Sequence, residues 1–320
     1  MRYEKALVTG GAGFIGSHLV RGLLRHDLEV VVIDNLLTGK REKVPPEAAF
    51  IKGDILDIEL IERITSQVDI VFHLAAVVSV RSSVKEFYAD AQTNIIGTLN
   101  LLQGCIRGKR VRKFIYASSM AVYADSPDPC PISETYTTEP LSPYGVSKLA
   151  SEKYVLQVGR QENFDTVVLR YFNTYGPGQT FTPYVGVITI FVNRLLARKP
   201  PIIFGDGEQR RDFIHAGDVV EATIRAMEED ITGEICNVGT GVATSVNEIT
   251  QMLCSRIDPE IKPVRAEGQP GELKNSVADI SKARKILKLS PQFRIEEKID
   301  EVIKSIRVSG NKQSKGTDYV

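Results

Sequence analysis

The stretch Ala6-Leu7-Val8-Thr9-Gly10-Gly11-Ala12-Gly13-Phe14-Ile15-Gly16 decides the fold of this chain. Residues 6–8 predict a short buried strand, and helical spacing of apolar residues follows the last glycine through residue 24. Residues 29–34 predict a second buried strand. Strand, glycine turn, helix and strand in this order form the context that a dinucleotide-binding fingerprint requires.

Each of three glycines in this turn has a predicted role. Gly10 permits the tight turn, Gly13 lets the backbone approach a pyrophosphate, and Gly16 lets the helix pack on the strand. The pyrophosphate would lie at the N-terminus of the helix, which places Phe14 and Ile15 among the candidate cofactor contacts. The alternative is a glycine-rich turn that binds no ligand.

Asp34 ends the second predicted strand. A carboxylate at this position can accept a hydrogen bond from a ribose 2′-hydroxyl and would repel a 2′-phosphate, so we expect NAD rather than NADP. Asn35 follows directly and is a further candidate contact. The alternative is that Asp34 is a solvated residue that opens the turn at 34–36.

Apolar runs alternate with helical patterns through the first half of the chain. Further strands are predicted at 49–54, 69–76, 113–119 and 165–170, and helices at 91–106 and 147–160. This alternation predicts an α/β fold with a doubly wound parallel (Rossmann) sheet, in which ligands bind at the carboxyl ends of the strands. The residues near those ends are Gly10, Asp34, Asp54, Ala75, Ser119 and Asn173.

The pattern changes after residue 175, where prolines and aromatic residues increase. Strands are expected at 201–207, 211–215 and 235–239, and helices at 187–198, 246–257 and 281–287, the last of which closes the chain. We therefore assign residues 1–175 to an NAD-binding domain and 176–308 mainly to a smaller mixed α/β substrate domain. A segment near 213–240 is expected to return to the main sheet, and the polar residues 309–320 predict a flexible tail.

Charge, hydropathy and cysteine usage exclude several classes of protein. The chain has 40 basic and 40 acidic residues, so nothing indicates a nucleic-acid-binding surface. No apolar run reaches the roughly 18 residues of a membrane span, and the N-terminus has no signal-peptide pattern. The four cysteines lack CxxC spacing and the four histidines are dispersed, which argues against a metal site and fits a cytoplasmic protein in a reducing compartment.

Tyr144 and Lys148 form the candidate catalytic pair. They are four residues apart and share one face if the segment is helical. A phenol with a pKa of about 10 is a poor base at neutral pH, and a nearby ammonium lowers that pKa. The pair is therefore a candidate general base with its tuning group. The alternative is a solvated helix face, but the serine cluster Ser118-Ser119 lies about 25 residues upstream and supports the catalytic interpretation.

Together with Arg170-Tyr171-Phe172-Asn173, these motifs resemble the extended short-chain dehydrogenase/reductase family, and within it the UDP-glucose 4-epimerase group. The resemblance covers residues 6 to about 287. It implies that Ser119 is the catalytic hydroxyl, Tyr144 the base and Lys148 its partner. Simple capping of the strand end is the alternative for Ser119.

The resemblance also implies further contacts. Arg211 would bind the nucleotide diphosphate, unless it pairs with Asp212 or Asp218. The family commonly has an arginine where this chain has Gln269, and Lys274 is the candidate to supply the missing charge. Besides the glycine turn, the implied cofactor contacts are Asp34, Asn35, Asp54, Ile55, Leu74, Ala75, Ala76, Asn94 (which supports the active-site helix), Tyr144, Lys148 and Tyr171. The implied substrate contacts are Ser119, Tyr144, Asn173, Val187, Arg211, Gln269 and Ser276.

The expected activity is NAD-dependent 4-epimerisation of a UDP-hexose through a transient 4-keto sugar. Dehydratases and decarboxylases of the family carry an acidic residue just after the catalytic hydroxyl, and here the residues are Met120-Ala121-Val122. Alternatives are a UDP-glucuronate 4-epimerase, or a non-catalytic NAD-binding sensor or scaffold, which typically loses the tyrosine or lysine.

Two further expectations come from the resemblance. A homodimer would pair through helices 91–106 and 147–160, with apolar residues such as Leu99, Leu102, Val155 and Leu156 either in the contact or facing their own sheet. The pocket beside the sugar C2 group would be lined by Asn275 or, as we favour, the small Ser276, which would admit N-acetylhexosamines. Alternatively, Tyr175 or Tyr184 closes that pocket.

Overall fold

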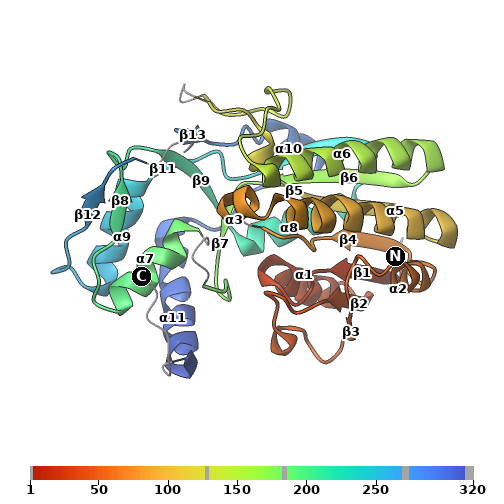
Figure 1. Cartoon of the computed structure of the whole chain (residues 1–320), viewed down its shortest axis with the longest axis horizontal. Helices are drawn as coiled ribbons and strands as arrows, with labels where there is room; N and C mark the ends of the chain where they lie inside the picture. The colour runs from red at the N-terminus through yellow and green to blue at the C-terminus, as the bar shows by residue number, and fades with distance from the viewer. Residues whose placement is uncertain (1–2, 79, 127–129, 182–185, 269–273, 314–320) are drawn as a thin grey trace.

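The computed structural model describes residues 3–78, 80–126, 130–181, 186–268 and 274–313. A larger lobe is built around a long sheet, and a smaller lobe beside it contains short strands and three helices, α7, α9 and α11 (Figure 1). None of the described helices is long and apolar enough to cross a membrane.

The larger lobe contains a seven-stranded sheet in the order β10-β6-β5-β4-β1-β2-β3, and every neighbouring pair is parallel. The order reverses between β1 and β4, which is the switch point at which doubly wound sheets bind ligands. The predicted fold class is confirmed. The strands are β1 Lys5–Thr9, β2 Glu29–Asp34, β3 Ala49–Lys52, β4 Ile70–His73, β5 Lys113–Ser119, β6 Asp165–Tyr171 and β10 Glu234–Val238.

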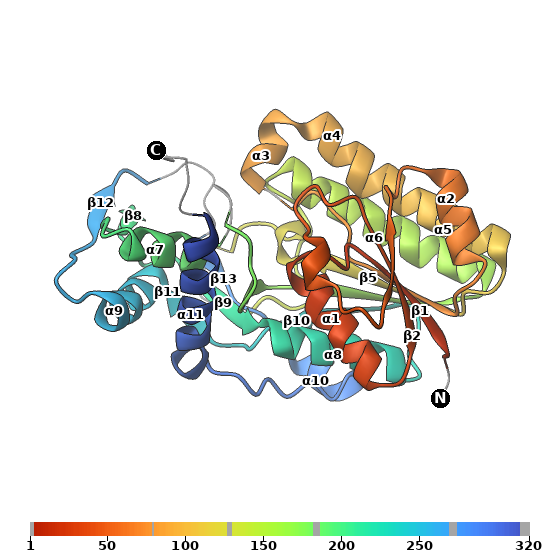
Figure 2. The ribbon, with the colours of Figure 1, turned by 90° about the horizontal axis from the view of Figure 1, so that it is seen from below.

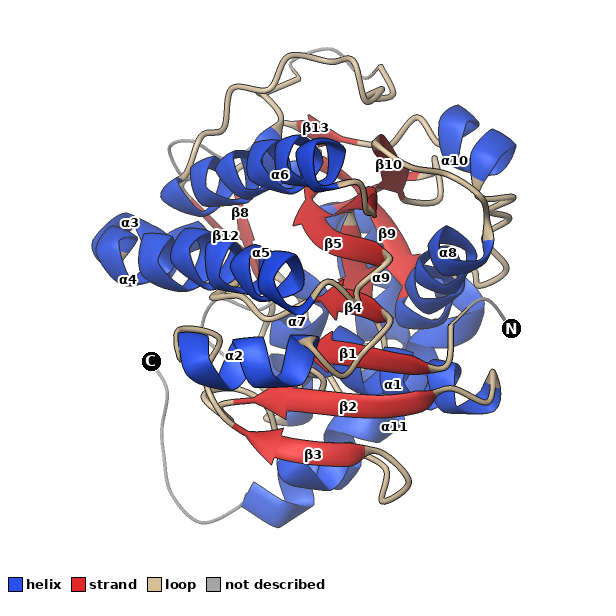
Figure 3. Cartoon of the chain, turned by 90° about the vertical axis from the view of Figure 1, so that its right-hand side faces the viewer, coloured by secondary structure: helices blue, strands red, loops and turns tan. Residues whose placement is uncertain are grey.

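Helices cover both faces of this sheet (Figure 3). On one face lie α1 Phe14–Arg25 and α8 Ala216–Glu228, and on the other α2 Ile58–Thr65, α5 Gly97–Gly108 and α6 Pro143–Glu162. Each layer encloses an apolar core, with Leu19 and Val220 in the first and Leu101 and Val155 in the second. Burying one such side chain stabilises the fold by roughly 1.5–3 kcal/mol. The helices of both layers are therefore held firmly on the sheet.

The helix predicted at 91–106 is interrupted by a wider turn. It consists of α4 Phe87–Ala91, a π-helical segment Gln92–Ile96 and then α5. The short helix α3 Val80–Lys85 precedes it. π-helical turns inside α-helices occur frequently at functional sites. This one places Asn94 against α6, as described below.

The smaller lobe is built on β9 Arg210–His215. This strand pairs with β11 Ala243–Ser245, β13 Asn275–Ser276 and β7 Asn173–Tyr175, and a separate pair is formed by β8 Ile202–Phe204 and β12 Val264–Ala266. Helices α7 Val187–Leu196, α9 Val246–Ile257 and α11 Ile295–Gln313 pack together around a third apolar core (Figure 2). Because β7 begins two residues after β6 ends, the chain passes from one sheet almost directly into the other.

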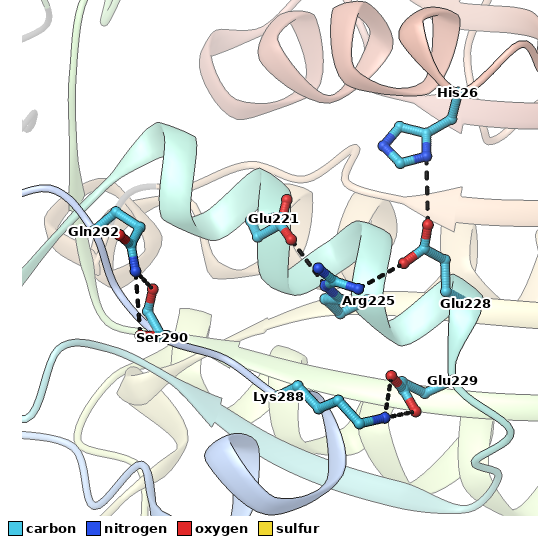
Figure 4. Close-up of polar contacts among 8 residues, drawn as sticks. All are labelled: His26, Glu221, Arg225, Glu228, Glu229, Lys288, Ser290 and Gln292. Atoms are coloured by element: carbon cyan, nitrogen blue, oxygen red, sulfur yellow. Dashed lines mark hydrogen bonds and ion pairs between the residues drawn. The ribbon is translucent and has the colours of Figure 1, made fainter.

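The chain returns to the larger lobe through α8 and β10, which lie within the segment predicted to return. Polar contacts fasten this return (Figure 4). His26, directly after α1, has its Nδ1 3.4 Å from a carboxylate oxygen of Glu228 of α8, and Lys288 Nζ lies 2.5 Å from the carboxylate of Glu229. Lys288 follows α10 Ser281–Ile286, so this part of the chain is anchored at the end of α8 before it reaches α11.

Four helices of the described residues were missed in the sequence: α2, α3, α8 and α11. The prediction that the helix at 281–287 closes the chain is wrong, because α11 follows it and extends to Gln313. Residues 309–313, which we expected in a flexible tail, are therefore helical, and 314–320 lie outside the described residues. The missed signal was apolar spacing of a helical period, at Ile295, Ile299, Val302 and Ile303, all of which are buried in the third core.

Candidate active site

Ser119 lies at the carboxyl end of β5, directly before the 3₁₀ turn Met120–Val122. Its hydroxyl oxygen accepts the backbone N–H of Ala121 at 3.2 Å, so Ser119 does cap this turn. The contact uses only a lone pair of the oxygen, and the hydroxyl proton can still be donated. The capping and catalytic interpretations of Ser119 are thus compatible.

The helix α6 carries both Tyr144 and Lys148. It begins at Pro143, four residues before the predicted start, because Ser142 caps it by accepting the N–H of Gly145 at 3.1 Å. Serine at the N-cap followed by proline is a strong helix start. Tyr144 and Lys148 are consequently one turn apart on the same helix, as the spacing predicted.

Gly145 brings the start of α6 close to Ser119. A Cβ atom on Gly145 would lie only 2.2 Å from the carbonyl oxygen of Ala121, in the turn that Ser119 caps. Only glycine permits this approach of helix and turn. It places Tyr144 close enough to Ser119 for a hydrogen bond between their side chains to act on the phenol.

Burial dominates the ionisation of Tyr144. Burial, with a smaller contribution from the negative charge of Asp90, raises the pKa of the phenol to about 12, although the hydrogen bond from Ser119 acts in the opposite direction. We expected Lys148 to lower this pKa, but in the protein alone burial outweighs any such effect. At neutral pH the phenol therefore holds its proton until additional positive charge favours the phenolate.

Lys148 is also buried, with 3% of its surface exposed. Burial lowers the pKa of its ammonium to about 8, although the charges of Glu152 and Asp90 act in the opposite direction. Its Nζ lies 4.5 Å from the centre of the Tyr116 ring, a cation–π distance. Lys148 is thus mostly protonated at neutral pH, and it is close to losing that charge.

A buried ion pair between Glu152 and Arg170 lies next to the catalytic residues. Glu152, one turn after Lys148, accepts hydrogen bonds from Arg170 Nε at 2.9 Å and Nη2 at 2.7 Å, and from Ser118 Oγ at 2.5 Å. All three side chains are buried, so the fork-like contact offsets their desolvation. Glu152 was not predicted, although its position four residues after Lys148 on one face of the helix was a signal in the sequence.

Asn94 connects three parts of the site. Its side-chain oxygen accepts the N–H of Val77 in the loop after β4 at 2.9 Å, and its amide donates to the Val77 carbonyl and to Ser147 Oγ of α6. It also donates to Asp90 at 3.0 Å. Asn94 thus joins the loop after β4 to α4 and α6, and its role as a support of the active-site helix stays a prediction.

His73, which we did not predict, extends this polar network. Its Nδ1 lies 2.8 Å from Thr9 Oγ1 and its Nε2 lies 2.9 Å from Thr98 Oγ1. Complete burial and the charge of Lys148 hold the pKa of His73 well below its usual range, so the ring is neutral. It therefore links β1, β4 and α5 without adding charge. No cluster of metal-ligating side chains occurs in the described parts of the chain.

The glycine turn has the close packing that a dinucleotide site needs. Gly10 has φ +71°, and a Cβ there would lie 2.8 Å from the backbone nitrogen of Ala75. A Cβ on Gly16 would lie 2.2 Å from the carbonyl oxygen of Gly10. Gly13 is the N-cap of α1 and has no side chain to occupy the helix N-terminus, where a phosphate would be bound.

Asp34 is more buried than a solvated turn residue would be, with 9% of its surface exposed. Its two oxygens accept the N–H of Ala12 at 3.0 Å and that of Leu36 at 2.8 Å, which ties the end of β2 to the glycine turn. Each oxygen keeps a lone pair for a ribose hydroxyl. Asn35 donates to Asp54 at 2.9 Å, so these polar side chains meet at the ends of β2 and β3. The chain's own groups thus fit a bound NAD.

The remaining cofactor candidates are less directly placed. Ile55 is buried against the backbone of Gly97, and the loop Leu74-Ala75-Ala76 adjoins Gly10. Tyr171 is buried in the first core, and its hydroxyl lies 2.7 Å from Thr223 Oγ1 of α8. A cofactor contact by Tyr171 would therefore have to come from its backbone or ring.

Three predicted substrate contacts meet on the small sheet. Arg211 and Ser276 are directly paired across β9 and β13, and Asn173 of β7 pairs with Phe213 two residues along β9. Asn173 Nδ2 and Ser276 Oγ are buried and lack a hydrogen-bond partner among the described residues, which suits atoms that await a polar ligand. Val187 begins α7, and Gln269 lies outside the described residues.

The two carboxylates considered as partners of Arg211 have other partners. Asp212 accepts backbone N–H groups of Thr240, Gly241 and Ala278. Asp218 accepts those of Gln292 and Phe293. Arg211 Nη1 donates to the carbonyl oxygens of Arg210 at 2.9 Å and Lys274 at 3.5 Å.

Comparison with known proteins gives consistent relatives. A model of the NAD dependent epimerase/dehydratase family matches residues 6–239. A putative UDP-glucose 4-epimerase of Methanocaldococcus jannaschii is 39% identical over 298 residues, which are 93% of this chain and 96% of that protein. The solved UDP-glucose 4-epimerase of Thermotoga maritima, with UDP-glucose, has a TM-score of 0.91 and 40% identity, covering 95% of this chain and 99% of that one.

Solved structures with other sugars are also similar. The UDP-N-acetylglucosamine 4-epimerase of Methanobrevibacter ruminantium, with UDP-N-acetylmuramic acid, has a TM-score of 0.91 and 36% identity over 97% of this chain and 100% of that one. The UDP-glucuronic acid 4-epimerase of Bacillus cereus, with UDP-glucuronic acid and NAD, has a TM-score of 0.88 and 34% identity over 95% and 99%. The predicted resemblance and cofactor are confirmed, and this chain belongs to the NAD-dependent epimerase/dehydratase family.

Proposed function

We propose that this chain catalyses the NAD-dependent 4-epimerisation of a UDP-hexose, converting UDP-glucose and UDP-galactose into each other. The observation that carries the proposal is the convergence of Ser119, Tyr144 and Lys148 at the carboxyl end of β5, one strand from the switch point of the sheet. The similarity to UDP-sugar 4-epimerases over nearly the whole chain supports it.

The mechanism assigns one task to each side chain. Tyr144 takes the proton of the sugar 4-hydroxyl. Ser119, whose hydroxyl hydrogen-bonds the phenol in the protein alone, turns that hydroxyl to the same sugar oxygen when the sugar is bound. Lys148 supplies positive charge that favours the phenolate, which burial alone would disfavour. NAD, when bound, supplies the hydride chemistry and a positive ring. Tyr144 keeps the proton while the 4-keto sugar turns over, and returns it afterwards.

The turn after Ser119 argues for epimerisation over elimination or decarboxylation. The residues Met120–Val122 form a 3₁₀ turn that carries no acid, and Val122 is completely buried. A departing hydroxyl group would lack a proton donor from this turn. The proton chemistry then remains at the 4-hydroxyl, where Tyr144 and Ser119 act.

The proposal also concerns which UDP-sugars the site accepts. Ser276 is a small residue on β13, and its buried hydroxyl has no hydrogen-bond partner in the described part of the chain. We propose that it leaves room for a 2-acetamido group. UDP-N-acetylglucosamine and UDP-N-acetylgalactosamine would then be substrates as well. A UDP-uronic acid is the alternative substrate class, because a glucuronic acid 4-epimerase is among the similar structures.

The deciding experiment incubates the purified protein and NAD with UDP-glucose, UDP-galactose, their N-acetylated forms and UDP-glucuronic acid. NMR then reads inversion at C4. We expect inversion of the hexoses and N-acetylhexosamines, and none with the Tyr144→Phe variant. Inversion of UDP-glucuronic acid alone would assign the uronate activity. Tight NAD binding with no inversion of any sugar would favour a sensor or scaffold and contradict the proposal.

A further inference from the structure

We propose that residues 176–180 form a strap beside the cofactor site, and that Lys43 fastens this strap and so controls how fast NAD enters and leaves. The strap follows β7, which ends at Tyr175, and precedes α7. Cofactor binding, and not the chemistry of the sugar, is what the strap would govern. Its role can therefore be tested apart from the proposed 4-epimerase activity.

The backbone of Gly178, in the middle of the strap, is bound by both lobes. Its carbonyl oxygen accepts a hydrogen bond from Lys43 Nζ of the larger lobe at 2.8 Å, and its N–H donates to Ser305 Oγ of α11 in the smaller lobe at 3.0 Å. Gly178 has φ +85°, and a Cβ there would meet nothing within 4 Å. The position therefore favours glycine for its backbone conformation and not for lack of space.

The residues on either side of Gly178 are fastened in the same way. His18 of α1 lies with its Nε2 2.9 Å from the carbonyl oxygen of Pro177, and because a carbonyl can only accept, this nitrogen is the donor. Gln179 Oε1 accepts the hydroxyl of Thr189 of α7 at 2.6 Å. The strap is thus tied to the larger lobe through α1 and to the smaller lobe through α7 and α11.

Lys43 is the fastening with a full charge. It ends the 3₁₀ turn Arg41–Lys43 and is half-buried. Besides the Gly178 carbonyl, its ammonium donates to Thr180 Oγ1 at 3.1 Å, and its own carbonyl is held by Arg21 Nη2 of α1 at 2.8 Å. Hydrogen bonds from an ionised donor are roughly twice as strong as neutral ones. The loss of Lys43 should therefore loosen the strap more than the loss of any neutral contact.

Both partners of this contact adjoin the residues to which we assign the cofactor pyrophosphate. At the start of the strap, a Cβ on Gly176 would lie 3.5 Å from Cζ of Phe14, the first residue of α1. On the other side, the N–H of Lys40, just before the turn that carries Lys43, donates to the carbonyl oxygen of Ala12 in the glycine turn at 3.0 Å. The strap therefore closes beside the N-terminus of α1, where a phosphate would be bound.

A fastened strap has a kinetic signature that a simple attraction of NAD does not share. If Lys43 only attracted the phosphates of the dinucleotide, removing its charge would slow association and speed release. If it fastens the strap, removing it leaves the strap open for more of the time, so both rates rise. In the proposed reaction NAD ends each turnover unchanged, so slow release would not limit catalysis.

Stopped-flow fluorescence of NADH measures both rates without any sugar. Lys43→Met keeps a side chain of similar length and removes the donor. We expect the association and dissociation rate constants of NADH both to rise about tenfold, on the scale of losing hydrogen bonds from a charged donor. The matched control is Lys288→Met, which loses the contact with Glu229 at the C-terminal end of α8 and should keep both wild-type rates. Unchanged release or slower association in Lys43→Met, or an equal rise in the control, would overturn the proposal.

A second variant separates the strap from the charge of Lys43. Thr180→Val removes one acceptor of the ammonium, keeps the shape of the side chain and leaves every charge in place. It should raise both rates about threefold on its own and have no further effect in Lys43→Met. Unchanged rates in Thr180→Val, or an equal effect with and without Lys43, would reject the strap. The expected rates in a protein that inverts no sugar at C4 would support the strap and reject the proposed function.

Discussion

Burial sets the protonation of the residues at this site. It holds the Tyr144 phenol protonated, with a pKa raised to about 12, and brings the pKa of Lys148 down to about 8. The side chains alone therefore do not form an active base at neutral pH. NAD, when bound, would bring further positive charge, which lowers the pKa of Tyr144 and favours the phenolate. Catalysis is therefore expected to depend on the bound cofactor.

Replacing Tyr144 by phenylalanine tests the base directly. The ring remains buried, so the fold and NAD binding should persist, while the group that carries the proton is lost. We expect turnover to fall at least about 100-fold, the lower range for a positioned acid–base group. Steady-state assays and thermal unfolding of the purified variant check both expectations. More than a tenth of the wild-type turnover would point to another base.

Asp34 should determine the choice of cofactor. Asp34→Asn keeps acceptors for the N–H groups of Ala12 and Leu36 and removes the charge that repels a 2′-phosphate. We expect wild type to prefer NAD by at least about tenfold and the variant to narrow that preference. Calorimetric titration of cofactor-free protein with NAD and NADP measures both. Equal affinity of wild type for the two cofactors would contradict the role of Asp34.

Ser276 should set the size of sugar that the pocket accepts. The side chain is completely buried, and Ser276→Tyr would fill volume that packed interiors do not yield cheaply. We expect the variant to lose turnover of UDP-N-acetylgalactosamine at least about tenfold more than that of UDP-galactose. UDP-galactose is the internal control for folding. The pocket argument fails if wild type ignores the acetylated sugar, or if both substrates are affected equally.

At the scale of elements, helices and strands with a regular apolar pattern could be predicted from the sequence. Features that depend on particular polar contacts could not. The strand at 113–119 and the helix at 246–257 were predicted with their observed bounds, because their apolar periods are unbroken. The start of α6 was placed late because the signal lay in the Ser142-Pro143 cap. The π-helical segment at 92–96 depends on contacts of Asn94 with distant segments, which no local pattern records.

The junction between α6 and the turn after β5 gives a test at this scale. Gly145→Ala would place a Cβ 2.2 Å from the Ala121 carbonyl oxygen, so the helix must move away from Ser119. Gly159→Ala is the matched control on the same helix, with a Cβ 2.2 Å from Thr166 Cγ2 and far along the helix from Tyr144. Both should destabilise the fold, and only Gly145→Ala should lower kcat, by about tenfold or more. An equal loss of kcat in Gly159→Ala would contradict the role of Gly145 in placing Tyr144 beside Ser119.

At the scale of the whole molecule, several exposed apolar side chains lie on neighbouring helical segments of the larger lobe. Large apolar side chains are exposed along α4, the π-helical segment and α6: Phe87, Tyr88, Ile96, Val146 and Tyr154. Two residues that we had considered for a contact, Leu102 and Val155, lie instead in the core of their own sheet, and Leu99 and Leu156 pack partly against it. Exposed clusters of this kind commonly mark protein–protein contacts.

We expect this surface to form a homodimer. Tyr88 is 69% and Tyr154 47% exposed, and a charge at either position would be buried at the contact and unpaired. Wild type should be dimeric at micromolar concentration by light scattering, and Tyr88→Glu with Tyr154→Glu should be monomeric. The control is Val242→Glu, a 61% exposed apolar residue between β10 and β11, which should remain dimeric.

The surface also carries α4 and the π-helical segment, which hold Asp90 and Asn94. The monomeric variant should therefore also lose kcat, because fewer contacts would hold those side chains against α6. A monomeric wild type would remove the dimer and this coupling together.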